Sequence, residues 1–154
     1  MKAYLSILLF LVGIVCHSQE TIDEVSVKTS IQDFFIAFHE QDTTALRLMA
    51  HPSIQMQSIS IKEGEDADLV TTDYSNFLKA IYAIPKTTKF EEKIHSYKIQ
   101  VDGPMANAST TYSFYVNEEL SHCGVNTFQF FKEKGVWEII YIVDTRTKNG
   151  CKTM

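Results

Sequence analysis

The spacing of hydrophobic residues changes about halfway along the chain. In the first half, apolar residues recur three and four positions apart, which is the period of an amphipathic helix. One stripe of this kind predicts a helix over Val27–Phe38, and two shorter stripes predict helices over Thr44–Ala50 and Tyr74–Ile84. Pro52 and Pro85 are expected to end the second and third helices, because proline has no amide hydrogen to donate.

Short polar side chains precede two of these helices. Asp42 or Thr43 can cap the second helix and Asp73 the third, since an oxygen at this position accepts hydrogen bonds from the free amides of the first turn. His51 is expected in the turn that follows the second helix. An alternating pattern over Ile54–Ile61 predicts the first strand.

In the second half, apolar and polar residues alternate with a period of two, which is typical of β-strands. Four strands are predicted, over Ile94–Val101, Ala108–Val116, Val125–Phe131 and Val136–Val143. Short turns such as Lys134-Gly135 separate them, so consecutive strands are expected to pair as an antiparallel meander. Helices followed by such strands predict an α+β fold, with about three N-terminal helices covering one face of the sheet.

The last hairpin allows a prediction of which side chains share a face. If Lys134-Gly135 is a two-residue turn, Glu133 pairs with Val136 and fixes the register of both strands. The face expected to line the core then carries Asn126, Phe128, Phe130, Trp137, Ile139, Tyr141 and Val143. The outer face carries Val125, Thr127, Gln129, Phe131, Glu138, Ile140, Ile142 and Asp144. This outer face is too apolar for free solvent, so we predict that a second subunit covers it in a homodimer. A three-residue turn would mix the two sets.

The beginning of the chain has the pattern of an export signal. One lysine precedes an apolar run over Leu5–Val15, and small residues follow, so residues 1–18 are interpreted as a signal peptide cleaved after Ser18. The run is shorter than the roughly 20 residues that span a bilayer. We therefore expect a secreted or periplasmic protein without stable membrane insertion. A retained anchor is one alternative, and a lipoprotein acylated at Cys16 is another, ranked lower because the bulky Val15 precedes the cysteine.

Composition supports a single folded domain after this signal. The 154 residues are 45% hydrophobic and 21% charged, which suits one globular domain over residues 19–154. The formal net charge of −5 argues against a nucleic-acid partner and against binding to an anionic membrane surface.

The cysteines and acidic residues indicate neither a metal nor a cofactor. Cys123 and Cys151 remain after signal removal, and an oxidising compartment favours a disulfide between them. Two unpaired thiols or an intermolecular bridge stay open as alternatives. Neither cysteine belongs to a C-x-x-C motif, which disfavours redox chemistry and structural zinc. The acidic run Glu63–Asp68 lacks the spacing of a calcium loop and reads as a solvated loop.

Two stretches resemble a known superfamily. Phe34–Ile59 (FFIAFHEQDTTALRLMAHPSIQMQSI) is similar to the opening of nuclear transport factor 2-like (NTF2-like) domains, and Ser121–Arg146 (SHCGVNTFQFFKEKGVWEIIYIVDTR) to their last two strands. The chain resembles an exported bacterial member of the SnoaL-like or lumazine-binding-like type. The resemblance implies a cone-shaped, strongly curved antiparallel sheet around a pocket that the helices close, often in a dimer. Its relatives include ketosteroid isomerases, scytalone dehydratase, polyketide cyclases and domains without catalysis, so the fold is a poor guide to activity.

This resemblance suggests where a site would lie. The residues expected to line the pocket are Phe34, Phe35, Phe38, Asn126, Phe128, Trp137 and Tyr141. Enzymatic relatives place an acid or base inside the cone, for which His51, His122 and Asp144 are the candidates here. Each also has a structural explanation: a histidine at a turn or strand end, or an Asp144–Arg146 surface pair. His39 ends a helix, where a cation is favoured by the helix dipole.

Three functional hypotheses follow. The leading one is an exported, non-catalytic domain that holds a small apolar or aromatic ligand in its cone, because no acid-and-donor pair stands out. The second is a lyase or isomerase of the ketosteroid-isomerase or polyketide-cyclase type. The third is a protein-interaction module that uses the outer face of the sheet.

Overall fold

The computed structural model describes residues 20–61, 64 and 66–151. The predicted signal peptide, its cleavage site and Cys16 lie outside the described residues, as do two positions of the predicted acidic loop, Glu63 and Glu65. Within the described residues, no helix is long and apolar enough to cross a membrane.

Three helices occur in the described part of the chain, each overlapping a predicted one: α1 (Ile22–Glu40), α2 (Thr43–Leu48) and α3 (Tyr74–Ala83). α1 begins before the predicted Val27, where Thr21 and Glu24 form a capping box. Asp42 and Asp73 cap α2 and α3 through hydrogen bonds from backbone amides. α2 ends at Leu48, earlier than predicted, because the chain from Ala50 onward already pairs as a strand. His51 and Pro52 therefore lie at the start of this strand rather than in a turn, at an irregularity in its pairing between Ala50 and Gln55.

The sheet contains six strands in the described residues: β1 (Ala50–Ile61), β2 (Asp68–Thr72), β3 (Phe90–Asp102), β4 (Met105–Val116), β5 (Glu119–Glu133) and β6 (Val136–Thr147). Their order is β2-β1-β6-β5-β4-β3. The meander β3–β6 is antiparallel as predicted, which confirms the α+β fold class. β1 lies parallel to β6, so the sheet as a whole is mixed, and the sequence did not predict β2.

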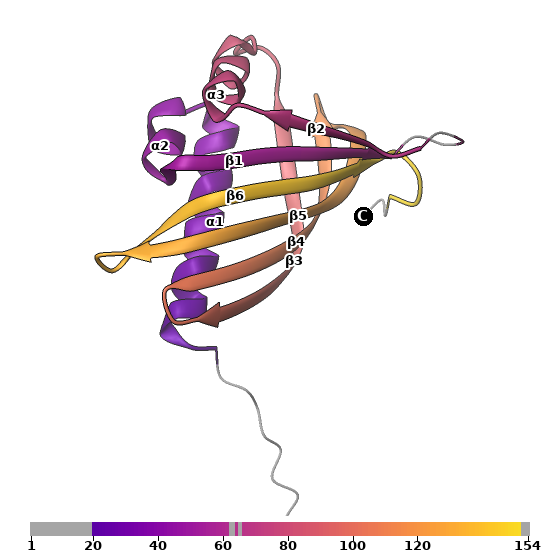
Figure 1. Ribbon diagram of the computed structural model, residues 1–154. Helices are drawn as coiled ribbons and strands as arrows, with labels where there is room; N and C mark the ends of the chain where they lie inside the picture. Colours follow the sequence, from indigo (N-terminus) through magenta and orange to yellow (C-terminus); the bar gives the residue numbers. More distant parts are fainter. Residues whose placement is uncertain (1–19, 62–63, 65, 152–154) are drawn as a thin grey trace, which may run out of the picture.

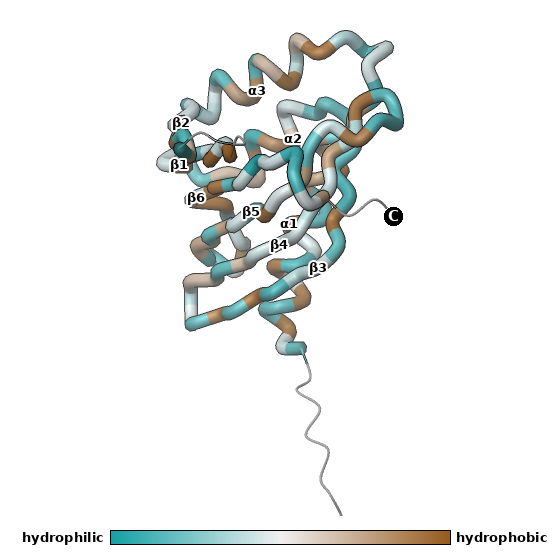
Figure 2. Tube along the Cα trace, turned by 90° about the vertical axis from the view of Figure 1, so that its right-hand side faces the viewer, coloured by the Kyte–Doolittle hydropathy of each residue, from teal (hydrophilic) through white to brown (hydrophobic). Residues whose placement is uncertain are grey.

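The sheet curls around α1, which crosses its concave face, while α2 and α3 lie beside the edge formed by β1 and β2 (Figure 1). Hydrophobic and polar positions alternate along β3, as Figure 2 shows. Gln41 connects the end of α1 to α3, since its side-chain amide donates to the carbonyl of Ile84 at 3.1 Å and to that of Ile81 at 3.3 Å. These contacts hold α3 beside the concave face.

A β-bulge changes the predicted register of the last hairpin. Near the turn, Glu133 pairs with Val136 and Phe130 with Ile139, as predicted, but the register then shifts by one residue. Beyond the shift, Phe128 pairs with Ile142 and Asn126 with Asp144. Because side chains alternate between faces, one extra residue moves the rest of the strand to the opposite face.

The bulge corrects four of the predicted face assignments. Ile142 and Asp144 are buried against the concave side, where the sequence reading placed them outside. Tyr141 and Val143 take their places on the outer face, where the hydroxyl of Tyr141 donates to Gln57 of β1.

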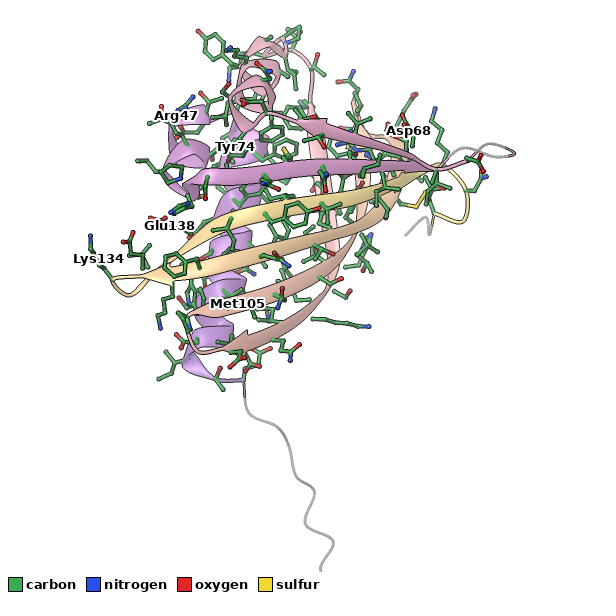
Figure 3. All side chains as sticks on the ribbon, viewed as in Figure 1. Arg47, Asp68, Tyr74, Met105, Lys134 and Glu138 are labelled. Atoms are coloured by element: carbon green, nitrogen blue, oxygen red, sulfur yellow. A yellow bond between two sulfur atoms is a disulfide. The ribbon has the colours of Figure 1, made fainter. Side chains whose placement is uncertain are left out.

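A disulfide joins Cys123 of β5 to Cys151, with their Cα atoms 5.6 Å apart. The pairing within the chain is therefore as predicted. It fastens the segment that follows β6 to the start of β5, at the end of the sheet opposite the Lys134 turn (Figure 3).

Candidate functional site

The concave face of the meander changes from apolar to polar along its length. Successive strands align their inward residues in rows, because paired residues on neighbouring strands lie on the same side of a sheet. Starting near the Lys134 turn, the rows are Val101, Ala106, Phe130 and Ile139; then Ile99, Ala108, Phe128 and Ile142; then Tyr97, Thr110, Asn126 and Asp144. Tyr112 and then Glu92, Phe114 and His122 follow. The third row thus begins a polar region inside the fold.

A cavity of about 250 Å³ lies over this change, and we call it the inner cavity. Helices supply most of its aromatic wall, and strands supply its polar wall. The apolar lining is Phe34, Phe35, Phe38, Met56, Phe77, Ile81, Ile84, Phe90, Phe114, Phe128 and Ile142. The polar lining is Glu92, Tyr112, His122, Asn126, Asp144 and Arg146.

Glu92 and Asn126 form one half of the polar wall. The side-chain amide of Asn126 donates to Glu92 Oε1 at 2.6 Å and to the hydroxyl of Thr110 at 3.4 Å. The pKa of Glu92 is raised to about 7, mainly by burial and also by the nearby charge of Asp144. The hydrogen bond from Asn126 and the charge of Arg146 favour the carboxylate and oppose this rise. The carboxyl group of Glu92 therefore exchanges its proton near neutral pH.

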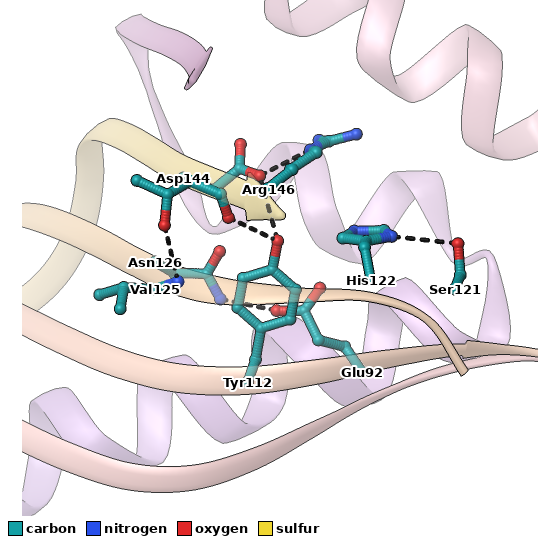
Figure 4. Close-up of polar contacts among 9 residues, drawn as sticks. Glu92, Tyr112, Ser121, His122, Val125, Asn126, Asp144 and Arg146 are labelled. Carbon is teal, nitrogen blue, oxygen red and sulfur yellow. Dashed lines mark hydrogen bonds and ion pairs between the residues drawn. The ribbon is translucent and has the colours of Figure 1, made fainter. Parts of the chain in front are cut away.

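Asp144, Tyr112 and Arg146 form the other half (Figure 4). The hydroxyl of Tyr112 donates to the carbonyl of Thr145 at 3.0 Å and lies 3.3 Å from Asp144 Oδ2. Arg146 Nε donates to the same carboxylate oxygen at 2.6 Å. Burial and the nearby carboxylates raise the pKa of Tyr112, so its hydroxyl keeps its proton. The Asp144–Arg146 pair considered from the sequence is therefore present, but its carboxylate is buried, since Asp144 is only 7% exposed while the Arg146 side chain is half exposed.

Gly124 lets the polar wall form. A Cβ atom at this position would collide with the carbonyl of Thr145, which approaches the backbone of β5 here. The same carbonyl accepts the hydrogen bond from Tyr112, and the side chain of Thr145 accepts one from the amide of Val125 at 3.1 Å. A residue without a side chain is therefore required where β5 and β6 pack around the site.

The structure brings two of the three candidate catalytic residues together. His122 lines the inner cavity beside Asp144, with its ring stacked on Phe114 at a centroid distance of 4.8 Å. Burial lowers the pKa of His122, which favours the neutral ring. His51 lies elsewhere, in a separate hollow that Arg47 and Tyr74 also line. Figure 3 labels these two residues, near α2 and α3.

His39 does not act as a cation at the end of α1, as its position in the sequence suggested. Its Nε2 accepts a hydrogen bond from the backbone amide of Glu92 at 2.8 Å, which requires that this nitrogen carries no proton. Burial lowers the pKa of His39 in agreement. The neutral ring therefore fastens α1 to β3 next to Glu92, and the explanation by a cation at the helix end is wrong.

Most of the residues predicted to line the pocket do line the inner cavity. Five of the seven residues line the inner cavity: Phe34, Phe35, Phe38, Asn126 and Phe128. Trp137 is buried near the hairpin turn, with the ammonium of Lys132 5.3 Å from its ring centre. Tyr141 lies on the outer face because of the bulge. Neither belongs to the cavity wall.

Sequence reasoning missed Glu92, Tyr112 and Arg146 as members of the site. A signal for Glu92 was present, since it stands in phase with Phe90 and Ile94 and so shares their face of the strand. A carboxylate at an inward position between apolar residues is a candidate for a shifted pKa. Within the described ranges, no group of three His, Cys, Asp or Glu side chains is placed to hold a metal ion.

Comparison with known proteins supports the fold at low sequence identity. No protein-family model and no curated protein matches the chain. Among solved structures, an NTF2-like protein from Cytophaga hutchinsonii aligns with a TM-score of 0.64 and 14% identity, covering 83% of this chain and 100% of its own. The beta subunit of a proposed aromatic-ring-hydroxylating dioxygenase from Novosphingobium aromaticivorans aligns with a TM-score of 0.68 and 10% identity, covering 86% and 94%. A Streptomyces avermitilis protein of the NTF2-like family, proposed to be a dehydratase, aligns with a TM-score of 0.59 and 14% identity. The alignment covers 81% of this chain and 96% of that protein. The chain therefore has the NTF2-like fold predicted from its sequence.

Proposed function

We propose that this protein is an exported binding protein that holds a small, ring-containing and largely apolar ligand in the inner cavity without transforming it. The observation that carries the proposal is the division of one cavity of about 250 Å³ into an aromatic wall and a hydrogen-bonding wall. Binding pockets for small molecules commonly combine a mostly apolar lining with a few placed polar groups.

The size and chemistry of the cavity limit the ligand. A cavity of about 150 Å³ accommodates benzene, so the inner cavity suits a body of one or two rings. Phe34 and Phe128 meet edge to face with centroids 5.7 Å apart, which leaves ring faces and edges available to an aromatic guest. At the other end, Glu92, Asn126 and Tyr112 offer acceptors and donors to one polar group of the ligand.

Export and dimerisation are parts of the same proposal. The disulfide between Cys123 and Cys151 supports an oxidising compartment. The outer face of the sheet carries Ile140, Tyr141, Val143 and the 38% exposed Phe131, which supports contact with a second copy of the chain. Light scattering on the oxidised protein and on Val143→Lys tests this contact: the wild type is expected to be a dimer and the variant a monomer.

Binding is tested with prodan, an uncharged two-ring probe whose fluorescence rises in apolar surroundings. We expect saturable binding to the oxidised wild type. Ile84→Trp, which places a larger side chain on the wall of the inner cavity, should weaken binding at least tenfold. Ile36→Trp is the matched control, because Ile36 is 55% exposed on α1.

Thermal melting shows that each variant is folded before its binding is compared. Equal binding by wild type and Ile84→Trp, or no binding by the wild type, would overturn the proposal. Native mass spectrometry of gently purified protein adds a direct check, since a retained small molecule appears as extra mass.

A lyase or isomerase is the second candidate, and the Glu92 carboxyl favours it. A group whose pKa is about 7 serves as a general base at neutral pH. The Tyr112 hydroxyl would donate to a developing oxyanion after it turns away from the Thr145 carbonyl that it bonds in this structure. The test follows exchange of the α-protons of 2-tetralone in D₂O by NMR. An enzyme would accelerate exchange with an apparent pKa near 7, Glu92→Gln would abolish this effect, and Glu91→Gln, on the adjacent exposed residue, would not. Exchange at the buffer rate would exclude proton abstraction from this ketone.

A further inference from the structure

A second hollow adjoins the inner cavity and shares two side chains with it. This outer cavity, of about 530 Å³, is lined by Ser60, Ile61, His122, Arg146, Thr147, Lys148 and Asn149. His122 and Arg146 also line the inner cavity. The two spaces therefore meet at these side chains, and a ligand longer than the inner cavity would extend between them.

Arg146 has donors left for such a ligand. Its Nε is bonded to Asp144 at 2.6 Å, whereas its two terminal nitrogens make no hydrogen bond to the described residues. Figure 4 shows these nitrogens pointing away from Asp144. The side chain of Arg146 is 52% exposed. One carboxylate therefore holds the guanidinium, and its other edge is open to a ligand. A free guanidinium edge fits a carboxylate with two parallel hydrogen bonds.

Lys148 supplies a second positive charge in the same space. Burial lowers the pKa of His122, and the charges of Arg146 and Lys148 lower it further, which places both cations close to one ring. No Asp or Glu is among the described residues that line the outer cavity. A chain with a net charge of −5 thus presents a locally cationic hollow beside an aromatic one.

The segment that carries Lys148 is held in place before any ligand arrives. The amide of Asn149 donates to the hydroxyl of Thr147 at 3.1 Å, and the disulfide fixes Cys151 to β5 two residues later. A preformed arrangement of this kind costs less ordering on binding.

We propose that the ligand is a ring-containing carboxylic acid, with its ring body in the inner cavity and its carboxylate bound by Arg146 and Lys148 in the outer cavity. This inference rests on the proposed binding function and adds to it the charge and the length of the ligand. His122, neutral at the junction, contacts the part of the ligand between ring and carboxylate.

The test compares two probes that differ in charge and have nearly the same shape: naphthalene-1-acetate and naphthalene-1-acetamide. Each is titrated into the oxidised protein by calorimetry at low salt. We expect the acetate to bind about tenfold more tightly than the amide, since hydrogen bonds to charged groups are stronger than neutral ones. Added salt should weaken the binding of the acetate and leave the binding of the amide unchanged.

Variants assign the effect to the two cations. Lys148→Gln should weaken acetate binding severalfold without changing amide binding. Arg146→Gln combined with Asp144→Asn removes the internal ion pair as a unit and should remove the preference for the acetate. Lys134→Gln, at the hairpin turn far from the outer cavity (Figure 3), is the control and should bind both probes as the wild type does.

The outcomes separate this inference from the binding function. Equal affinity for both probes, or a preference that survives both cation variants, would overturn the carboxylic-acid inference and leave the binding function standing. If neither naphthalene-1-acetate nor its amide binds while prodan does, the inference again fails alone. Failure of all three probes would overturn both.

Discussion

The two ends of the concave sheet face differ in what their side chains contribute. Near the Lys134 turn, the inward rows are fully apolar, and Phe130, Ala106 and Ile139 are at most 1% exposed. Beyond the bulge, the same face carries Asn126 and Asp144, which are buried with their polar groups joined to neighbours. The first end therefore gains stability from apolar burial, whereas the second gives up part of that gain for a cavity with hydrogen-bonding groups.

One sheet thus carries a hydrophobic core at its Lys134 end and the candidate site at its other end. Burying a carboxyl group disfavours its charged form, and burial is the main reason why the pKa of Glu92 is raised to about 7. The disulfide lies at the polar end of the sheet, where it stabilises the region that has the fewest apolar rows. Substitutions at the two ends should accordingly have effects of different size and different pH dependence.

The largest effect is expected at the apolar end. Phe130→Ala removes a side chain with 0% exposure and should lower the free energy of unfolding by about 3 to 5 kcal/mol, because it leaves a cavity among packed neighbours. Tyr82→Ala is the control, because Tyr82 is 77% exposed on α3, and should change the free energy of unfolding by under about 1 kcal/mol. Urea unfolding followed by circular dichroism measures both. Equal losses would contradict tight packing around Phe130.

Removal of the disulfide should cause the next largest loss of stability. Replacing Cys123 and Cys151 with serine releases a crosslink across 28 positions and should lower the free energy of unfolding by about 3 to 4 kcal/mol. Reduction of the wild type should give the same loss in the same unfolding experiment. A loss below about 1 kcal/mol in both would show that the polar end does not depend on this crosslink.

Glu92 should make stability depend on pH. Its pKa is about 7 in the folded protein and near 4.5 when solvated, so the folded state binds more protons between these values and stability falls as pH rises through this window. Relative to Glu92→Gln, the wild type should therefore lose about 3 kcal/mol between pH 4 and pH 8. Unfolding curves at both values test this, with Glu91→Gln as control. A gain of relative stability with pH would contradict the raised pKa.

The smallest effect is expected at Tyr112. Tyr112→Phe removes the hydroxyl that donates to Thr145 and contacts Asp144, which should cost about 1 to 2 kcal/mol because these buried acceptors lose a donor. Tyr115→Phe is the control, since its hydroxyl makes no hydrogen bond to the described residues. Unchanged stability in Tyr112→Phe, measured by urea unfolding, would indicate that water replaces the hydroxyl.

Much of the fold followed from local patterns. The stripe that includes Phe34 and Phe38 predicted α1, the aspartates at 42 and 73 predicted two helix starts, and alternation predicted the four-stranded meander. These features depend on residues close together in sequence, where periodicity and capping decide the outcome. β2 was missed because its five residues are largely exposed and pair only through β1.

The candidate site was predicted less well than the fold, mainly because one extra residue in β6 forms the bulge opposite Gln129. The two-residue turn fixed the hairpin register as far as Phe130, but the bulge opposite Gln129 cannot be seen in the alternation of β6, where Ile139 to Val143 are all apolar or aromatic. A run of this kind fits either face. The packing of β6 against both β5 and β1 selects the register that buries Ile142 and Asp144.

Local patterns in the sequence were enough to predict the α+β class, the starts of α2 and α3, the meander and the aromatic stripe of α1, because each of these is set by neighbouring residues. Only the tertiary structure decided that Glu92, Tyr112, Asn126, Asp144 and Arg146 meet around one cavity. They come from β3, β4, β5 and β6, and their contacts depend on strand register, on a bulge and on the close approach that Gly124 permits. Burial then sets the pKa of Glu92, since desolvation is a property of the assembled fold and not of the residue.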